Sequence, residues 1–293
     1  MENSYLIMII ITSEKCKAYG KNEPLENPSR IVNVLASLKN RKDIELKLNE
    51  KAATYKQLIL AHSEKYLRTL KNEEFNTEEL DTTIYPNIFQ YASLSVGTSL
   101  AGVEIALSGK NTFCLTRPPG HHATKNNLMG FCFLNNIAIS ALYLKNTGVK
   151  RIAVLDIDNH YGNGTQEILG GLEGIISLDI HMSSTYPNIT PISKQNCINF
   201  QLAGKSGEKP YLSALDSAIF EIKNFNPNIL LVSAGFDTFK EDPLENIGLN
   251  LNSYSKISRK IDSLGLPTTS ILEGGYSSEK LGNCISHYIS NLK

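Results

Sequence analysis

The chain has 293 residues, 41% of them hydrophobic, which is enough to bury one large core, and α/β domains often reach this size undivided. Its 29 basic and 29 acidic residues cancel, and no apolar run approaches the roughly 20 residues of a membrane span, so we expect neither nucleic acid nor membrane as a partner. The five cysteines are scattered without a CxxC spacing, which argues against a disulfide framework or a cysteine zinc site and fits a reducing, cytoplasmic setting.

Apolar runs of strand length alternate with helical patterns along most of the chain. The first run, 6–11, is too short for a signal-peptide core and is interpreted as a buried strand, whereas the polar stretch 71–83 is typical of a surface loop. Further strands are expected near 112–115, 151–157, 175–180, 229–232 and 269–272. Helices are expected near 88–107, 134–146, 211–224, 254–264 and 278–292.

This alternation predicts a single three-layer α/β/α domain over residues 1–293, with a mostly parallel central sheet. The polar motifs fall at or just beyond the ends of expected strands: RPPGHH (117–122), DIDNHYGNG (156–164), Asp237 after SAGF, and GGY (274–276). In open α/β sheets the carboxyl ends of the strands form the ligand crevice. We therefore expect these distant segments to converge on one site.

Three side chains in these motifs could share one metal ion. Asp158 and His160 stand two residues apart, so in an extended strand they point to the same side. Asp237 would supply a third ligand and leave a position open for water, as catalytic zinc sites require. Taken alone, the Asp-x-Asp-x-His segment is explained as well by a polar strand end without metal.

Other residues of these motifs fit proton transfer and charge stabilisation. His121 and His122 follow a stiff Pro-Pro-Gly turn and suit a pair of proton-transfer groups with different pKa values. Asp156 and Asn163 could accept hydrogen bonds from the two rings and fix their tautomers, although either could instead cap a turn. Tyr276, after two glycines, could donate to a developing oxyanion, but a lone tyrosine is more often a packing residue.

Taken together, the motifs resemble the histone deacetylase and acetylpolyamine amidohydrolase family over nearly the whole chain. The order RPPGHHA, GFCFLNN, DIDNHYGNGTQ, SAGFD, DP and LEGGY is the order found in that family. The class II branch looks most similar because of Asn163 within GNGTQ.

The resemblance implies a role for each matching residue. Asp158, His160 and Asp237 look like the metal ligands, and the remaining catalytic residues would be His121, His122, Asp156, Asn163 and Tyr276. The substrate-binding residues would be Phe131 and Tyr186 as aromatic walls, Gly130 as a backbone acceptor near the mouth, Arg30 beneath the site, Asp81 as a rim acid, and Leu244.

The family resemblance also implies the cofactors and the substrate class. Zn²⁺, or Fe²⁺ in its place, would be the catalytic ion. K⁺ is expected as a structural ion bound through backbone oxygens near Asp156, Asp158 and His160, and near Asp179 and Ile180. The expected partner is an acetylated lysine in a protein or peptide, with an acetylated polyamine as the alternative. The polyamine branch carries Glu where this chain has Leu244, which favours acetyl-lysine. The sequence leaves the oligomeric state open.

Two other functions compete with this interpretation. An arginase-like ureohydrolase has similar architecture but needs further acidic ligands for two manganese ions, where Asn159 and Thr238 stand here. A catalytically inactive acyl-lysine-binding protein would lack part of the machinery, whereas every residue needed for turnover is present.

Overall fold

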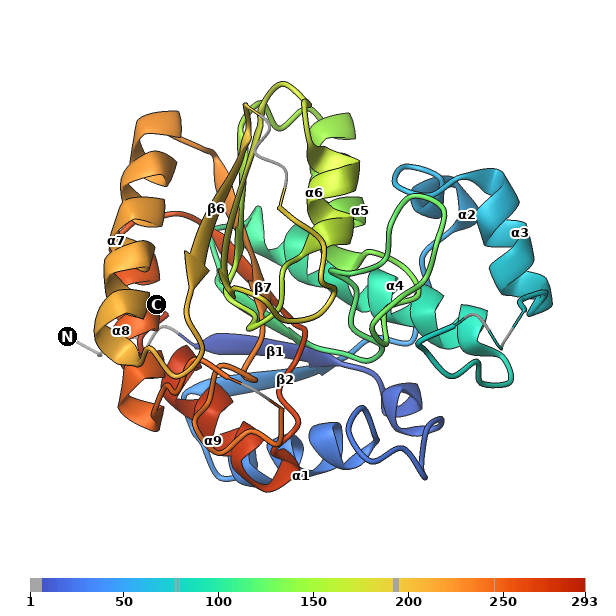
Figure 1. Ribbon diagram of the computed structural model, residues 1–293, viewed down its shortest axis with the longest axis horizontal. Helices are drawn as coiled ribbons and strands as arrows, with labels where there is room; N and C mark the ends of the chain where they lie inside the picture. Colours follow the sequence, from blue (N-terminus) through green and yellow to red (C-terminus); the bar gives the residue numbers. More distant parts are fainter. Residues whose placement is uncertain (1–6, 77, 79, 192–194, 245, 293) are drawn as a thin grey trace.

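The computed structural model describes residues 7–76, 78, 80–191, 195–244 and 246–292. Within these ranges eight strands form one sheet, in the order β2-β1-β3-β8-β7-β4-β5-β6, and every neighbouring pair is parallel (Figure 1). The strands are β1 (Met8–Thr12), β2 (Ile44–Leu48), β3 (Thr112–Leu115), β4 (Ile152–Asp156), β5 (Ile175–Met182), β6 (Cys197–Leu202), β7 (Ile229–Ala234) and β8 (Thr268–Leu272).

Helices cover both faces of the sheet. The described helices are η1 (Glu14–Lys17), α1 (Ser29–Leu38), α2 (Tyr55–Leu58), α3 (Glu64–Asn72), α4 (Ile88–Ala106), α5 (Asn136–Asn146), α6 (Asn163–Leu169), α7 (Glu208–Phe225), α8 (Leu251–Asp262) and α9 (Ser278–Ile289). Side chains of α1, α7, α8 and α9 share one hydrophobic core with the sheet, and side chains of α3, α4 and α5 share the other (Figure 1). The architecture is therefore an α/β/α sandwich. None of the described helices is both long enough and apolar enough to span a membrane.

The central strands are apolar on both faces because both are covered. In β1, Met8 and Ile10 belong to one core, and Ile9 and Ile11 belong to the other. All of these side chains are at most 3% exposed. A strand buried on both sides reads as a continuous apolar run, which is why such strands are visible in the sequence.

The expected elements were confirmed, and several others were missed. All six expected strands and all five expected helices are present, with ends shifted by a few residues; Leu6 lies outside the described residues. The sheet is wholly parallel where a mostly parallel one was expected. The missed strands β2 and β6 are the two edges of the sheet, and the solvent-facing residues of β2 interrupt its apolar pattern. The helices α1, α2, α3 and α6 were also missed.

The strand order explains why the polar motifs meet. β3, β8, β7 and β4 are consecutive in the sheet, and each of the four motifs follows one of them. Because the strands are parallel, all four carboxyl ends lie at the same edge. Segments as far apart in sequence as 117–122 and 274–276 are therefore brought together at this edge.

Candidate active site

Asp158, His160 and Asp237 form a buried cluster at this edge of the sheet. The Nδ1 atom of His160 lies 3.1 Å from Asp158 Oδ1 and 3.0 Å from Asp237 Oδ2. One ligand atom from each residue lies within 4.8 Å of the others. Strand β4 ends at Asp156, so Asp158 and His160 are not on the strand, and the loop that follows β4 brings them together. The three expected metal ligands thus converge, although strand periodicity is not the reason.

Main-chain N–H groups hold the two carboxylates in place. Gly274 N donates to Asp158 Oδ2 over 2.8 Å, and Asn159 N donates to Asp237 Oδ1 over 2.9 Å. The other oxygen of Asp237, Oδ2, is buried, and its polar contact among the described residues is the His160 ring, 3.0 Å away without hydrogen-bond geometry. A Cβ on Gly274 would lie 2.2 Å from this oxygen, so only glycine permits such a close approach. An unsatisfied buried carboxylate oxygen beside an imidazole is what a site built for a cation provides.

The electrostatics of the cluster also favour a cation. Burial, together with the neighbouring Asp158, raises the pKa of Asp237 to about 6. Burial alone would lower the pKa of His160, but Asp237 and Asp158 outweigh it and raise that pKa to about 10. Two buried carboxylates therefore repel each other and attract positive charge. Two oxygen ligands and one nitrogen ligand suit a divalent ion such as Zn²⁺ or Fe²⁺, so the residues fit the expected metal.

His121 and His122 lie beside this cluster with different hydrogen-bond partners. Their ring centroids are 4.0 Å apart. His121 Nδ1 lies 3.0 Å from Asp156 Oδ2, and His122 Nδ1 lies 2.8 Å from Asn163 Oδ1. The sequence suggested Asp156 and Asn163 as partners of the two rings but not which residue pairs with which ring.

Burial and charge set the pKa values of the two rings apart. Burial would lower the pKa of His121, but the carboxylates of Asp156 and Asp158 raise it well above its usual value. Burial and the nearby rings of His121 and His160 hold the pKa of His122 well below 6.5. These opposite directions favour a charged His121 and a neutral His122 at neutral pH.

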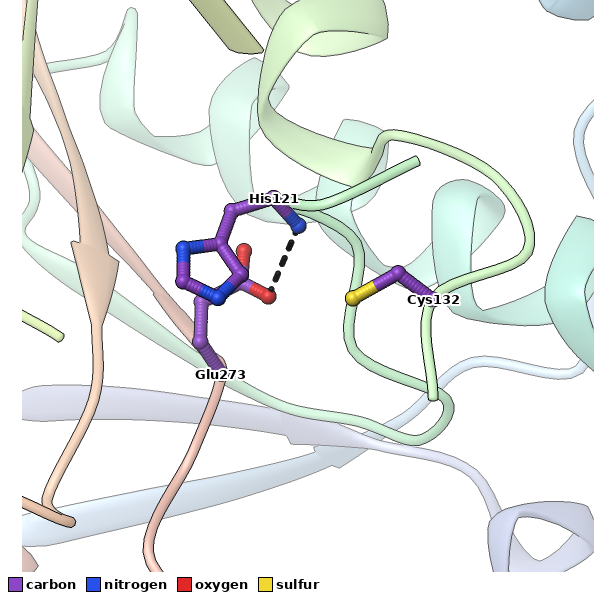
Figure 2. A group of neighbouring side chains, drawn as sticks. All are labelled: His121, Cys132 and Glu273. Carbon is purple, nitrogen blue, oxygen red and sulfur yellow. Dashed lines mark hydrogen bonds between the residues drawn. The ribbon is translucent and has the colours of Figure 1, made fainter. Parts of the chain in front are cut away.

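The carboxylate of Glu273 holds the main chain that carries this histidine pair. It is fully buried, and one oxygen accepts N–H groups from Gly120 over 2.6 Å and His121 over 3.1 Å. Figure 2 shows the Glu273 carboxylate against His121, with the hydrogen bond from the His121 main-chain N–H, and Cys132 nearby. One possible ligand atom from each of the three residues lies within 4.8 Å of the others. Burial raises the pKa of the Cys132 thiol well above its usual value, and the thiol donates to Gly130 O over 3.3 Å. Because Glu273 is already engaged by the main chain, we interpret this second group as a scaffold.

Tyr276 reaches the pocket from the segment after β8. The guanidinium of Arg30 lies 5.1 Å from the centre of the Tyr276 ring, and its Nε donates to Gly275 O over 2.8 Å. Asp242 Oδ2 accepts the N–H of Tyr276 over 2.7 Å. Burial raises the pKa of the Tyr276 phenol well above 10, so its hydroxyl remains a donor at neutral pH. Arg30 is fully buried beneath the site, as expected, and does not line the pocket.

A cavity of about 420 Å³ leads from the surface to the cluster. Its lining consists of Leu25, Asp81, His122, Gly130, Phe131, His160, Thr185, Tyr186, Leu244 and Tyr276. The rings of Phe131 and Tyr276 meet edge to face at 5.7 Å, and the ring of Tyr186 meets that of His122 in the same way at 4.9 Å. The cavity therefore has aromatic walls, and His122 and the expected ligand His160 are part of its lining.

The side chain of Asp179, in one part of the region where potassium was expected, is engaged by protein groups. Asp179 Oδ2 accepts the N–H of Gly162 over 2.8 Å, and Asp179 Oδ1 lies 2.8 Å from His181 Nδ1. These contacts order the chain near Ile180, where the ion was expected. A potassium ion there stays a prediction.

Comparison with known proteins identifies the family. A family model described as a histone deacetylase domain matches residues 24–292. The chain belongs to the histone deacetylase family. It is 33% identical, over 94% of its length and 87% of the relative, to a probable deacetylase of Methanothermobacter thermautotrophicus. It is also 37% identical to acetylpolyamine amidohydrolase 1 of Pseudomonas aeruginosa, over 66% of this chain and 58% of that one.

The fold agrees with this family. A crystal structure of acetylpolyamine aminohydrolase from Burkholderia pseudomallei superposes with a TM-score of 0.87, covering 97% of this chain and 98% of that one at 22% identity. The protein is therefore a hydrolytic deacetylase of the histone deacetylase and acetylpolyamine amidohydrolase family. The family match supports a deacetylase over the arginase-like ureohydrolase and over the catalytically inactive binding protein.

Several residues of the site were not assigned from the sequence. Glu273 and Asp242 were noted only as letters of the LEGGY and DP motifs, and Leu25 and Thr185 of the lining were not noted at all. Glu273 carried a usable signal, because a charged residue directly after a buried apolar strand needs a partner. Leu25 and Thr185 lie in loops whose course the sequence does not specify.

Proposed function

We propose that the protein is a zinc-dependent amidohydrolase that removes acetyl, or another short acyl group, from the side-chain amine of acyl-lysine. The observation that carries the proposal is the placement of a cation-seeking cluster and a neutral histidine at the inner end of an aromatic-walled cavity. Such a cavity accepts a slender neutral chain and excludes water from the reacting amide.

Asp158, His160 and Asp237 would hold the ion. When bound, it polarises the acyl carbonyl and the attacking water and so generates a nucleophile at neutral pH. Fe²⁺ would fit the same ligands, so the choice of zinc is part of the proposal.

The histidines move the protons. Because His122 Nδ1 is bonded to Asn163, its Nε2 is the free base that takes a proton from the attacking water. His121 lies between the carboxylates of Asp156 and Asp158 and keeps its positive charge, so it does not take part in the proton transfer itself. The protonated His122 then gives its proton to the departing amine, which would otherwise be a very poor leaving group. The Tyr276 hydroxyl donates to the oxyanion as it forms.

The substrate is proposed from the lining of the cavity. Leu244 and Phe131 present apolar surface, which suits the methylene chain of acetyl-lysine better than the cationic chain of a polyamine. An acetylated polyamine is the second candidate, because relatives named acetylpolyamine amidohydrolase match the chain. Glu245, next to Leu244, lies outside the described residues.

A turnover screen tests the proposal. Acetyl-lysine peptides, acetylspermidine and longer acyl-lysine peptides would be compared at equal concentration, with Asp237→Asn as the inactive control. We expect the acetyl-lysine peptide to be hydrolysed fastest and the control to release no product. Faster hydrolysis of acetylspermidine would overturn the choice of substrate, and hydrolysis by the Asn variant at the normal rate would overturn the site.

A further inference from the structure

The mouth of the cavity is bridged by the carboxylate of Asp81. Its Oδ1 accepts the N–H of Gly130 over 3.2 Å and the hydroxyl of Thr82 over 2.9 Å. Its Oδ2 accepts the hydroxyl of Tyr186 over 2.5 Å. The bond to Tyr186 joins segments 105 residues apart in sequence. Both oxygens of this exposed carboxylate are thus engaged by the protein itself.

Tyr186 has little freedom to leave this position. Its ring meets the ring of His122 edge to face at 4.9 Å. A Cβ on Gly130 would lie 2.8 Å from Tyr186 Cε1, so the ring lies directly against the glycine backbone. The hydroxyl is therefore presented to Asp81 by packing, and forming the bond costs little side-chain entropy.

The bridge matters because Asp81 is the only carboxylate among the described residues that line the cavity. A substrate tail with ammonium groups would seek this charge, since a carboxylate within about 4–6 Å stabilises an ammonium ion. A hydroxyl bonded to the carboxylate competes for the same oxygen and fixes its direction. A phenylalanine ring would pack in the same place but would leave Oδ2 free.

We propose that the Tyr186 hydroxyl sets the charge selectivity of the cavity mouth by occupying Asp81, and so disfavours substrates with cationic tails. This inference rests on the proposed function, because it assumes that the tail of the substrate passes Asp81 on its way to the catalytic cluster. Tyr186 then has two roles: its ring forms part of the cavity wall, and its hydroxyl occupies the carboxylate of Asp81.

Competition against hydrolysis of an acetyl-lysine peptide with neutral flanking residues tests the inference. The competitors are acetylspermidine and an N-alkylacetamide of the same length without charge. In Tyr186→Phe we expect the inhibition constant of acetylspermidine, relative to the neutral compound, to fall about three- to tenfold, as expected when one hydrogen bond no longer competes. In an Asp81→Asn background the same Tyr186→Phe change should have no effect on the ratio.

A matched control separates this bond from a general effect of losing a hydroxyl. Tyr143 donates to Glu104 over 2.8 Å on the exposed surface between α5 and α4, so Tyr143→Phe should leave both inhibition constants unchanged. An unchanged ratio in Tyr186→Phe, or an equal change in the Asp81→Asn background, would overturn the inference. Failure of the wild type to hydrolyse the peptide would instead overturn the proposed function, so the two failures are distinguishable.

Discussion

Replacement of Glu273 tests whether its carboxylate holds the histidine turn in place. The side chain is fully buried and accepts N–H groups from Gly120 over 2.6 Å and His121 over 3.1 Å, while Ser233 donates to its other oxygen over 3.3 Å. In Glu273→Ala the two main-chain donors lose their acceptor. Each unpaired donor costs about 1–3 kcal/mol, so we expect a loss of about 2–6 kcal/mol in the free energy of unfolding. A typical domain has only about 5–15 kcal/mol.

Glu273→Gln is the matched variant. Its amide oxygen can accept both N–H groups, and its amide nitrogen can donate to the Ser233 hydroxyl. Burial raises the pKa of Glu273, which means that the charge itself is costly, so the neutral amide should cost less than about 1 kcal/mol. Urea denaturation measures the free energy of unfolding of both Glu273 variants and of Ser233→Ala. If Ala cost no more than Gln, Glu273 would not be holding the turn.

Three further substitutions test the chemistry. Tyr276→Phe should lower kcat by a factor of about 10²–10³, because it removes one donor to the oxyanion. The melting temperature should not change, because the Tyr276 hydroxyl makes no hydrogen bond among the described residues. A near-normal rate would exclude the oxyanion role. Asn163→Asp places a carboxylate 2.8 Å from the His122 ring and should raise its pKa. Activity requires neutral His122 and is lost as the pH falls through the pKa of His122. The acid limb of the kcat/KM profile should therefore move to higher pH by about one unit or more. An unmoved acid limb would show that His122 is not the base. Leu244→Glu should shift kcat/KM toward acetylspermidine over an acetyl-lysine peptide, whereas an unchanged ratio would mean that residue 244 does not contact the substrate.

The centre of the fold was predictable because both faces of its strands are covered. Runs such as those of β4 and β7 are fully buried and therefore apolar throughout. β2 lies at an edge of the sheet and is half exposed, so no continuous apolar run marks it. Its sequence IELKL alternates apolar and polar residues, a strand signal that was not used in predicting the fold. A strand buried on both faces shows a continuous apolar run, whereas a half-exposed edge strand shows at most a short alternation.

The candidate site, like the fold, was only partly predictable from the sequence. Asp158, His160 and Asp237 were identifiable because polar residues that follow buried strands must meet at one edge of a parallel sheet. The bond between Asp81 and Tyr186 depends on two loops whose paths are set by tertiary contacts, and no spacing in the sequence encodes it. For Glu273 the sequence signals that a partner is needed, but not that the partners are the N–H groups of Gly120 and His121, more than 150 residues away.

The metal content of the purified protein tests the central claim most directly. Elemental analysis after dialysis should find about one zinc or iron per chain in the wild type. It should find almost none in Asp237→Asn, which replaces the charged carboxylate beside His160 with a neutral amide. Asp216→Asn, a change to an exposed carboxylate paired with Lys260, is the matched control and should retain the ion. Two manganese ions per chain, or an undiminished metal content in Asp237→Asn, would contradict a single catalytic metal held by Asp158, His160 and Asp237.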